Sequence, residues 1–231
     1  MSQHPHIARG VVRPVECIAE GWELVRKELP LYIGMVVIML MGSSLVPFVI
    51  QGPLTCGLFM CLARSARGET PSIELFFKGF DKFVPCLIIA LIQVGTSIVL
   101  AFSFMIVFMM FVFGALAASQ GGEPNPVAFV GVFALYPVMF LVLFTAQALF
   151  LLAYPTLASQ DVDGLTAIRL SAKAVRANAA GIVGLILLTA LLALAGMLVC
   201  LVGVLVVLPV IYGAHYAAYR RIFGNDLSAF D

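Results

Sequence analysis

Residues 83–122 have the sequence FVPCLIIALIQVGTSIVLAFSFMIVFMMFVFGALAASQGG, in which no side chain is charged. A transmembrane helix needs about 20 predominantly apolar residues, and this run is far longer. As one helix, residues 84–118 would extend about 52 Å at about 1.5 Å per residue, whereas the hydrocarbon core of a bilayer is about 30 Å thick. The stretch therefore predicts a membrane helix that is longer than the membrane it crosses.

Three further long stretches of the chain also lack charged residues. Residues 29–63, 124–160 and 177–219 also contain no Asp, Glu, Lys or Arg. Of all residues, 62% are hydrophobic and 11% are charged, against about 25% charged residues in ordinary soluble domains. A soluble fold of this size cannot bury so much apolar surface. We therefore expect an all-α fold, a polytopic helical membrane protein in which residues 1–231 form a single membrane domain.

The cations predict how the chain crosses the membrane. All thirteen Lys and Arg residues lie before residue 28, in 64–82, in 169–176 or at 220–221, whereas 119–127 has none. Cytoplasmic loops collect Lys and Arg, so both termini should be cytoplasmic and 119–127 should lie on the far side. Residues 29–63 and 177–219 each begin and end on the cytoplasmic side, so each must cross the membrane an even number of times, and we expect two crossings. The two middle stretches, 83–122 and 124–160, each cross once. About six spans follow, in what we expect to be a bacterial inner membrane.

Pro and Gly mark the expected breaks between spans. The first hairpin should break around Pro47 and residues 51–53, and the last near residues 200–203, with Pro209 at the entry to the final helix. The central pair of long helices is expected to form a hairpin over residues 84–158. The five cysteines lack CxxC spacing and are interpreted as free thiols.

Three segments beside the spans have the pattern of amphipathic helices lying in the membrane interface, residues 13–29, 72–83 and 163–178. Asp163 and Ser72 are the expected N-caps of two of them, and Pro14 suits a first helical position. Such helices either sense lipid headgroups or simply connect spans and set their depth.

A sequence repeat links the two ends of the chain. The copies cover about 13–68 and 163–224 and both begin on the cytoplasmic side, which predicts a parallel repeat about an axis along the membrane normal. At an offset of 156, the residues Pro53, Gly57, Arg64 and Gly68 recur as Pro209, Gly213, Arg220 and Gly224; at an offset of 150, the residues Val25, Arg26 and Gly34 recur as Val175, Arg176 and Gly184.

Small residues four apart predict close helix contacts in both copies. Gly57 and Cys61 form one such pair, and Gly213 and Ala217 form the other. Small side chains let helix backbones approach closely in lipid. We therefore predict that these four residues are helix-packing positions, with the two helices packing against their neighbours or against one another.

The overlong central helix predicts contact between subunits. Residues 102–113 are too apolar to face water, so the helices either bend within the membrane or bury their outer halves against other chains. Met105, Phe108, Met109 and Val112 share one face at i, i+3, i+4 and i+7, and we predict them at an oligomer interface.

The sequence offers little catalytic chemistry. None of the twelve acidic residues lies in an expected span, and HExxH, G-x-S-x-G and phosphate-loop motifs are missing. We expect no catalytic, cofactor-binding or metal-binding residue, and no enzymatic activity or nucleic-acid partner. The polar residues expected at depth could line a path for a solute or could bond to neighbouring helices; they are Gln51, Gln93, Thr96, Ser97, Thr145 and Gln147.

Four short motifs resemble a known group of proteins: residues 21–24 (GWEL), 53–57 (PLTCG), 167–171 (AIRLS) and 203–209. The chain resembles uncharacterised bacterial multi-pass membrane proteins of the YciC-like kind and the membrane domain attached to some glycerophosphodiester phosphodiesterases. The resemblance implies a helical membrane domain with no assigned reaction, and the phosphodiesterase activity is not implied because its catalytic domain is absent from this sequence.

Two functions remain open on this basis. The first is a non-enzymatic membrane protein, surrounded by lipids, that acts as a self-assembling or membrane-organising homo-oligomer. The alternative is a transporter or channel for a small or lipid-like solute, which the parallel repeat and the glutamines at depth favour.

Overall fold

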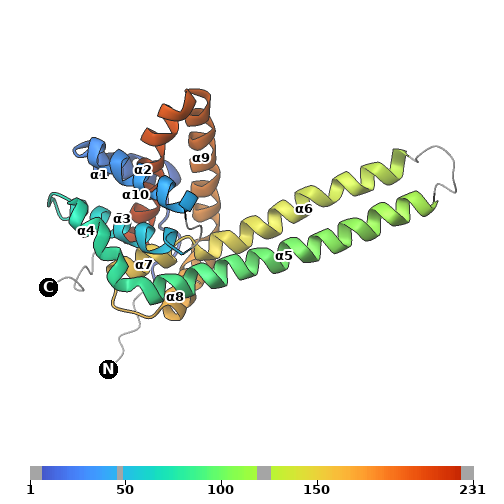
Figure 1. The fold of residues 1–231 in the computed structure, drawn as a ribbon, viewed down its shortest axis with the longest axis horizontal. Helices are drawn as coiled ribbons and strands as arrows, with labels where there is room; N and C mark the ends of the chain where they lie inside the picture. Colours follow the sequence, from blue (N-terminus) through green and yellow to red (C-terminus); the bar gives the residue numbers. More distant parts are fainter. Residues whose placement is uncertain (1–6, 46–48, 119–125, 225–231) are drawn as a thin grey trace. The chain divides into compact units, whose positions relative to one another are not determined.

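The computed structural model describes residues 7–45, 49–118 and 126–224, and every regular element in these ranges is helical (Figure 1). Of the described residues, 87% are helical. Three helical stretches are long and apolar enough to cross a membrane, Ile73–Ala115, Phe133–Ser159 and Ala179–Leu198. The expected all-α fold with membrane-spanning helices is therefore confirmed at this level.

The elements follow one another with short connections. In chain order they are α1 (Pro14–Arg26), α2 (Leu29–Leu45), α3 (Gln51–Ala66), α4 (Ile73–Phe77), the 3₁₀ helix η1 (Lys78–Lys82), α5 (Phe83–Ala118), α6 (Pro126–Phe150), α7 (Ala153–Ser159), α8 (Gly164–Ala177), α9 (Ala179–Leu198) and α10 (Cys200–Phe223).

The helices divide into two compact units. The first contains residues 1–91 and 148–231, and the second contains residues 92–147, which are most of α5 and α6. The expected hairpin of residues 84–158 therefore contributes its middle to the second unit and its two ends to the first.

In the first unit, α3 is deeply enclosed, since every residue from Gly52 to Ala63 is buried. Each amphipathic segment covers a different inner helix. Helix α1 packs on α10, α4 and η1 pack on α3, and α8 packs on α7. The inner helices α3, α7 and α10 also touch one another, so the amphipathic helices form an outer layer around them.

Small residues make these three contacts possible. A Cβ on Gly21 of α1 would lie 2.8 Å from the Val210 carbonyl oxygen of α10, and one on Gly79 of η1 would overlap the backbone of α3 at Pro53 and Gly57. No side chain larger than hydrogen fits at either place. At the third contact the small residue is a serine, Ser171 of α8, which is buried.

Ser171 also explains where α6 ends. Its hydroxyl donates to the Leu149 carbonyl oxygen at 2.6 Å, and the Leu152 amide donates back to the Ser171 hydroxyl at 3.1 Å. These bonds satisfy backbone groups that a continuous helix would pair internally. The second central helix therefore ends at Phe150 and α7 follows it, whereas the sequence suggested one helix running on to residue 158.

The expected N-caps are present. The Asp163 carboxylate accepts from the Thr166 amide at 3.3 Å, and the Ser72 hydroxyl accepts from the Leu75 amide at 3.2 Å. Pro14 is the first residue of α1, as predicted. The caps fix where α8 and α4 begin. They therefore also fix where Ser171 of α8 and Gly79 of η1, which follows α4, meet the inner helices.

One expected boundary is wrong. Pro209 does not enter the last helix; α10 begins at Cys200 and Pro209 lies inside it. Proline removes one backbone bond of a helix, but membrane helices tolerate this where neighbouring helices satisfy the freed group. The break itself falls at Val199, between α9 and α10, close to the expected residues 200–203. The expected break at Pro47 lies outside the described residues, as do residues 119–125 of the far-side loop.

The second unit is an antiparallel helix pair (Figure 1). Helix α5 continues without interruption through Gly95 and Gly114, and α6 continues through Pro137. Phe104 and Phe108 of α5 pack against Tyr136 of α6, with ring centroids 6.0 and 5.5 Å apart. An aromatic seam therefore joins the two helices along their middle.

Candidate assembly surface and buried polar groups

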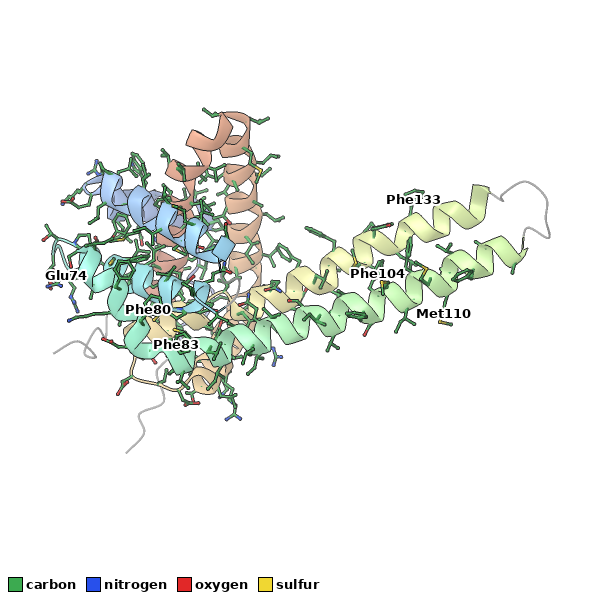
Figure 2. The ribbon with its side chains drawn as sticks, in the orientation of Figure 1. Glu74, Phe80, Phe83, Phe104, Met110 and Phe133 are labelled. Atoms are coloured by element: carbon green, nitrogen blue, oxygen red, sulfur yellow. The ribbon has the colours of Figure 1, made fainter. Side chains whose placement is uncertain are left out.

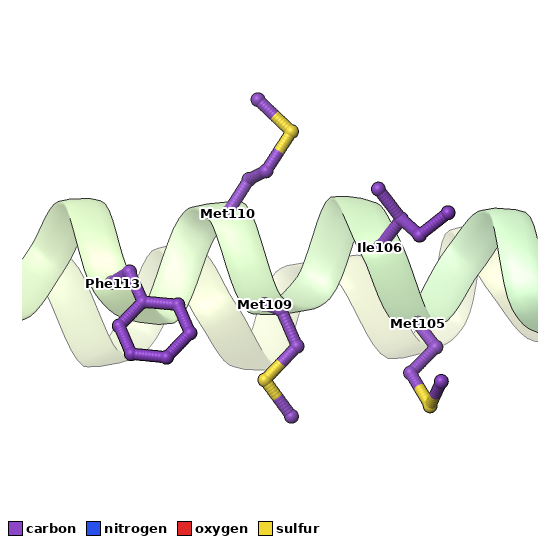
Figure 3. A pocket seen from close by; sticks show the side chains of 5 residues that line it. All are labelled: Met105, Ile106, Met109, Met110 and Phe113. Atoms are coloured by element: carbon purple, nitrogen blue, oxygen red, sulfur yellow. The ribbon is translucent and has the colours of Figure 1, made fainter.

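The outer face of α5 in the second unit carries two parallel ridges of apolar side chains. Ile106 and Met110 form one edge, and Met105, Met109 and Phe113 form the other (Figure 3). Between them lies a shallow apolar groove of about 510 Å³. Ridges of residues four apart are the features that interdigitate when one helix packs on another.

These side chains are unusually exposed for their chemistry. Met110 is 70% exposed and points away from α6 (Figure 2), and Phe113 is 66% exposed. Single exposed apolar residues are ordinary, but a contiguous apolar surface marks a membrane or protein contact. The groove and its two ridges are called the α5 outer face below.

The structure divides the predicted oligomer-interface residues between two faces. Met105 and Met109 belong to the α5 outer face. Phe108 is half-buried and packs against Tyr136 within the hairpin, and Val112 is also half-buried. A substitution at Phe108 therefore disturbs the hairpin itself as well as any contact between copies.

The predicted helix-packing residues lie in tight places, but they do not meet each other. A Cβ on Gly57 would overlap the Phe76 carbonyl of α4, and a Cβ on Gly213 would lie 2.7 Å from the Gly21 carbonyl oxygen of α1. The Cys61 thiol donates to the Ser72 carbonyl oxygen at 3.6 Å, and Ala217 is fully buried.

Helices α3 and α10 touch through aromatic rings. Phe59 of α3 lies 5.8 Å from Tyr212 and 6.5 Å from Tyr216 of α10, measured between ring centroids. The small-residue faces of these two helices are thus occupied by amphipathic helices, and their larger side chains meet one another.

The polar residues of the central hairpin bond to each other. The Gln93 amide donates to Gln147 at 2.7 Å, the Gln147 amide donates to the Ser97 hydroxyl at 2.6 Å, and that hydroxyl donates to the Gln93 carbonyl oxygen. Thr145 donates to the carbonyl oxygen of Leu141 in its own helix. These hydrogen bonds join α5 to α6. They also occupy polar groups of Gln93, Ser97 and Gln147 that could otherwise face a solute.

Three buried polar atoms of the first unit make no close hydrogen bond with the described residues: Ser159 Oγ, His215 Nε2 and Tyr216 OH. The hydroxyls of Ser159 and Tyr216 nevertheless lie close enough to interact with each other. Buried polar groups are normally hydrogen-bonded, so His215 Nε2 is the atom beside which a water molecule or a polar solute would be favourable. Next to Ser159 in the sequence, the Gln160 amide donates to Tyr219, and Lys82 donates to the Leu157 and Gln160 carbonyls.

Ion pairs attach helix α1 to α10. Arg221 of α10 pairs with Glu16 at 2.7 Å and also with Glu20, both on α1. Hydrogen bonds from Arg13 and Arg221 hold the pKa of Glu16 below its ordinary value. Burial raises the pKa of the neighbouring Cys17 thiol, which keeps it protonated and unreactive at neutral pH.

No three His, Cys, Asp or Glu side chains in the described part of the chain are placed to hold a metal ion. Cys17, Cys56, Cys61 and Cys86 are buried free thiols.

Sequence reasoning missed three residues that build the first unit, Gly21, Gly79 and Ser171. A usable signal existed, because each is a small residue within an amphipathic segment. Gly21 and Ser171 are also related by the repeat offset of 150. No protein-family model, curated protein or solved structure matches this chain.

Proposed function

We propose that this chain is a non-enzymatic integral membrane protein that acts by assembling with copies of itself through the α5 outer face. The observation that carries the proposal is that α5 is one uninterrupted helix of 36 residues, about 54 Å long at about 1.5 Å per residue. In the described part of the second unit, its exposed side chains are apolar except for that of Ser103.

The proposed arrangement in the membrane has six spans. The three hairpins are α2–α3, α5 with α6–α7, and α9–α10, and an amphipathic segment precedes each one. We propose both termini on the cytoplasmic side of a bacterial inner membrane, because the basic loops should stay inside. The two sequence copies, 13–68 and 163–224, are then the first and third of these parallel units.

The depth of the α5 outer face argues for a protein partner. Lys82 is the last charged residue before α5 and should remain at the membrane surface. A hydrocarbon core of about 30 Å is crossed by about 20 helical residues, or by about 26 at a tilt of about 40°. Met110 and Phe113 lie beyond either limit, where lipid tails do not cover them. Copies of the same helix would cover each other there.

The test is to make the α5 outer face polar. Met105, Met109 and Met110 are replaced together by Ser, which should leave the hairpin intact because these side chains point away from α6. The matched control replaces Leu187, Leu191 and Leu194 of α9 by Ser. These side chains are similarly exposed, but they lie in a helix of 20 residues, which is short enough to stay within the hydrocarbon core. Particle mass in native-lipid discs should fall to a single copy for the α5 variant and stay at the parental value for the control.

Each of three possible results would contradict a different part of the proposal. A parental particle containing one copy refutes self-assembly. An oligomeric parent whose mass is unchanged by the α5 substitutions refutes the placement of the interface. A control that dissociates as readily as the α5 variant shows that loss of exposed apolar surface, rather than loss of this face, is responsible.

A transporter or channel is the second candidate, and one observation favours it. His215 presents a buried Nε2 atom without a hydrogen-bond partner among the described residues, where a polar solute could be held. Vesicles containing the full chain would then pass small polar solutes faster than empty vesicles, and His215→Leu would slow that flux. Flux indistinguishable from that of empty vesicles rules this candidate out.

A further inference from the structure

Helix α8 differs from the other amphipathic segments in its charge. Between Gly164 and Ala177 it contains three cations and no acidic residue. Arg169, Lys173 and Arg176 are all exposed, and their spacing of four and three residues puts them on one stripe. Leu165, which is 41% exposed, continues the same stripe.

The opposite face of α8 is fixed. Gly164, Ala167, Ser171 and Ala174 are buried, and the two hydrogen bonds of Ser171 attach the helix to the α6–α7 junction. The cationic stripe is therefore displayed outward from a rigid support, and it is called the α8 basic face below.

The cations of the α8 basic face have no carboxylate partner within the described residues. On α1, by contrast, Arg13 pairs with Glu16 and Arg26 pairs with Glu23. Residues 13–28 contain three cations and four acidic residues. Carboxylates of the protein thus neutralise the cations of α1, whereas the cations of α8 remain available to an anionic ligand outside the protein.

The position of α8 along the chain identifies what lies next to it. Helix α9 begins at Ala179, two residues after α8 ends, and it is a candidate membrane span. Arg176 therefore lies within one helical turn of the point where the chain enters the hydrocarbon. Cations beside the end of a span lie at the level of lipid headgroups, and anionic lipids attract them.

We propose that the α8 basic face, made by Arg169, Lys173, Arg176 and Leu165, binds the headgroups of anionic phospholipids in the leaflet from which α9 enters the membrane. The long side chains of Arg and Lys place their apolar stems near the acyl boundary and their charges at the phosphates. Leu165 adds apolar contact on the same side. This inference does not depend on whether the chain forms oligomers.

The test uses the full chain, purified in a neutral detergent, with native mass spectrometry to measure bound dioleoylphosphatidylglycerol and dioleoylphosphatidylcholine. The variant replaces Arg169, Lys173 and Arg176 by Gln, which preserves helix propensity. The matched control replaces Arg13, Arg26 and Lys27 by Gln and so removes the same charge from α1. Unchanged helix content and melting temperature in phosphatidylcholine establish that each variant is folded.

The parent is expected to bind phosphatidylglycerol more tightly than phosphatidylcholine. The α8 variant should lose this preference by about fivefold for each charge removed, while the α1 control keeps most of it. Equal preference in the parent and the α8 variant overturns the proposal, and so does an equal loss in both variants. Displacement of phosphatidylglycerol by an equal concentration of inorganic phosphate also overturns it, because the face would then be a site for free anions.

Discussion

At the scale of single residues, three small side chains decide how closely the amphipathic helices approach the inner ones. Gly21 and Gly79 lie directly against the backbones of α10 and α3. Ser171 differs because the helix it meets is interrupted, and its hydroxyl pairs with both the donor and the acceptor freed there. The residue type at each contact follows from the continuity of the partner helix.

Replacing Ser171 by Ala should leave the Leu152 amide without its partner. A buried group that loses its hydrogen bond costs about 1–3 kcal/mol, so thermal unfolding in detergent should occur at a lower temperature. Ser103→Ala serves as the control, because Ser103 is exposed and bonds within its own helix, and its effect should stay within about 0.5 kcal/mol. Equal melting temperatures for the Ser171 variant and the parent would show that the bonds do not hold α8.

Replacing Gly21 by Leu should separate α1 from α10. A bulky side chain in a close-packed contact typically costs about 1–3 kcal/mol, and the backbone atoms of Val210 and Ala214 cannot move as a flexible side chain would. Gly34→Leu is the matched control, since nothing lies near a Cβ at that position. If Gly21→Leu and Gly34→Leu unfold at the same temperature, the close contact of α1 with α10 is not what stabilises this unit.

At the scale of elements, local patterns were predictable and long-range ones were not. Asp163 and Ser72 cap their helices because the cap and its amide partner are three residues apart. The end of α6 escaped prediction because Ser171, which captures the freed backbone groups, lies about 20 residues away. Pro209 was misplaced because proline is a weaker helix breaker between packed membrane helices than in water.

The faces of α5 illustrate a second limit of prediction from sequence, which is that an apolar helix gives no sign of which side meets its neighbour. All sides of this helix are apolar, so periodicity alone could not separate the side that meets α6 from the side that does not. Phe108 and Val112 were therefore grouped with Met105 and Met109, although the aromatic contact with Tyr136 turns Phe108 toward α6. In the amphipathic helices charge marks the outer side, but it did not reveal that the apolar Leu165 is exposed beside the cations of α8.

The α1–α10 ion cluster should weaken in acid. Because the pKa of Glu16 in the folded protein is lowered from its ordinary value of 4.5, its contribution to stability is present above that value and is lost as the pH falls through the lowered pKa. The melting temperature of the parent should drop as the pH falls below 4.5, and that of Glu16→Gln should drop less. Parallel pH profiles for the two proteins would contradict this role of Glu16.

At the scale of the whole molecule, the proposed six spans with both termini inside predict which positions a membrane-impermeant reagent can reach. Single cysteines at Ser2, Gly68, Asp163 and Asp231, introduced into a chain whose native cysteines have been replaced, should react with a membrane-impermeant maleimide only after the membrane is opened. A cysteine at Gly122 should react in intact cells. Labelling of Gly68 from outside would overturn the first hairpin and the parallel orientation of the repeat.

We propose that other copies of the chain cover the α5 outer face. The decisive measurement is the protein mass of the particle released from native membranes with its lipid belt, measured on the parent without cross-linking. Self-assembly predicts a single defined species whose protein mass is an integral multiple, at least twofold, of 24.8 kDa. A particle containing one 24.8 kDa chain would contradict it.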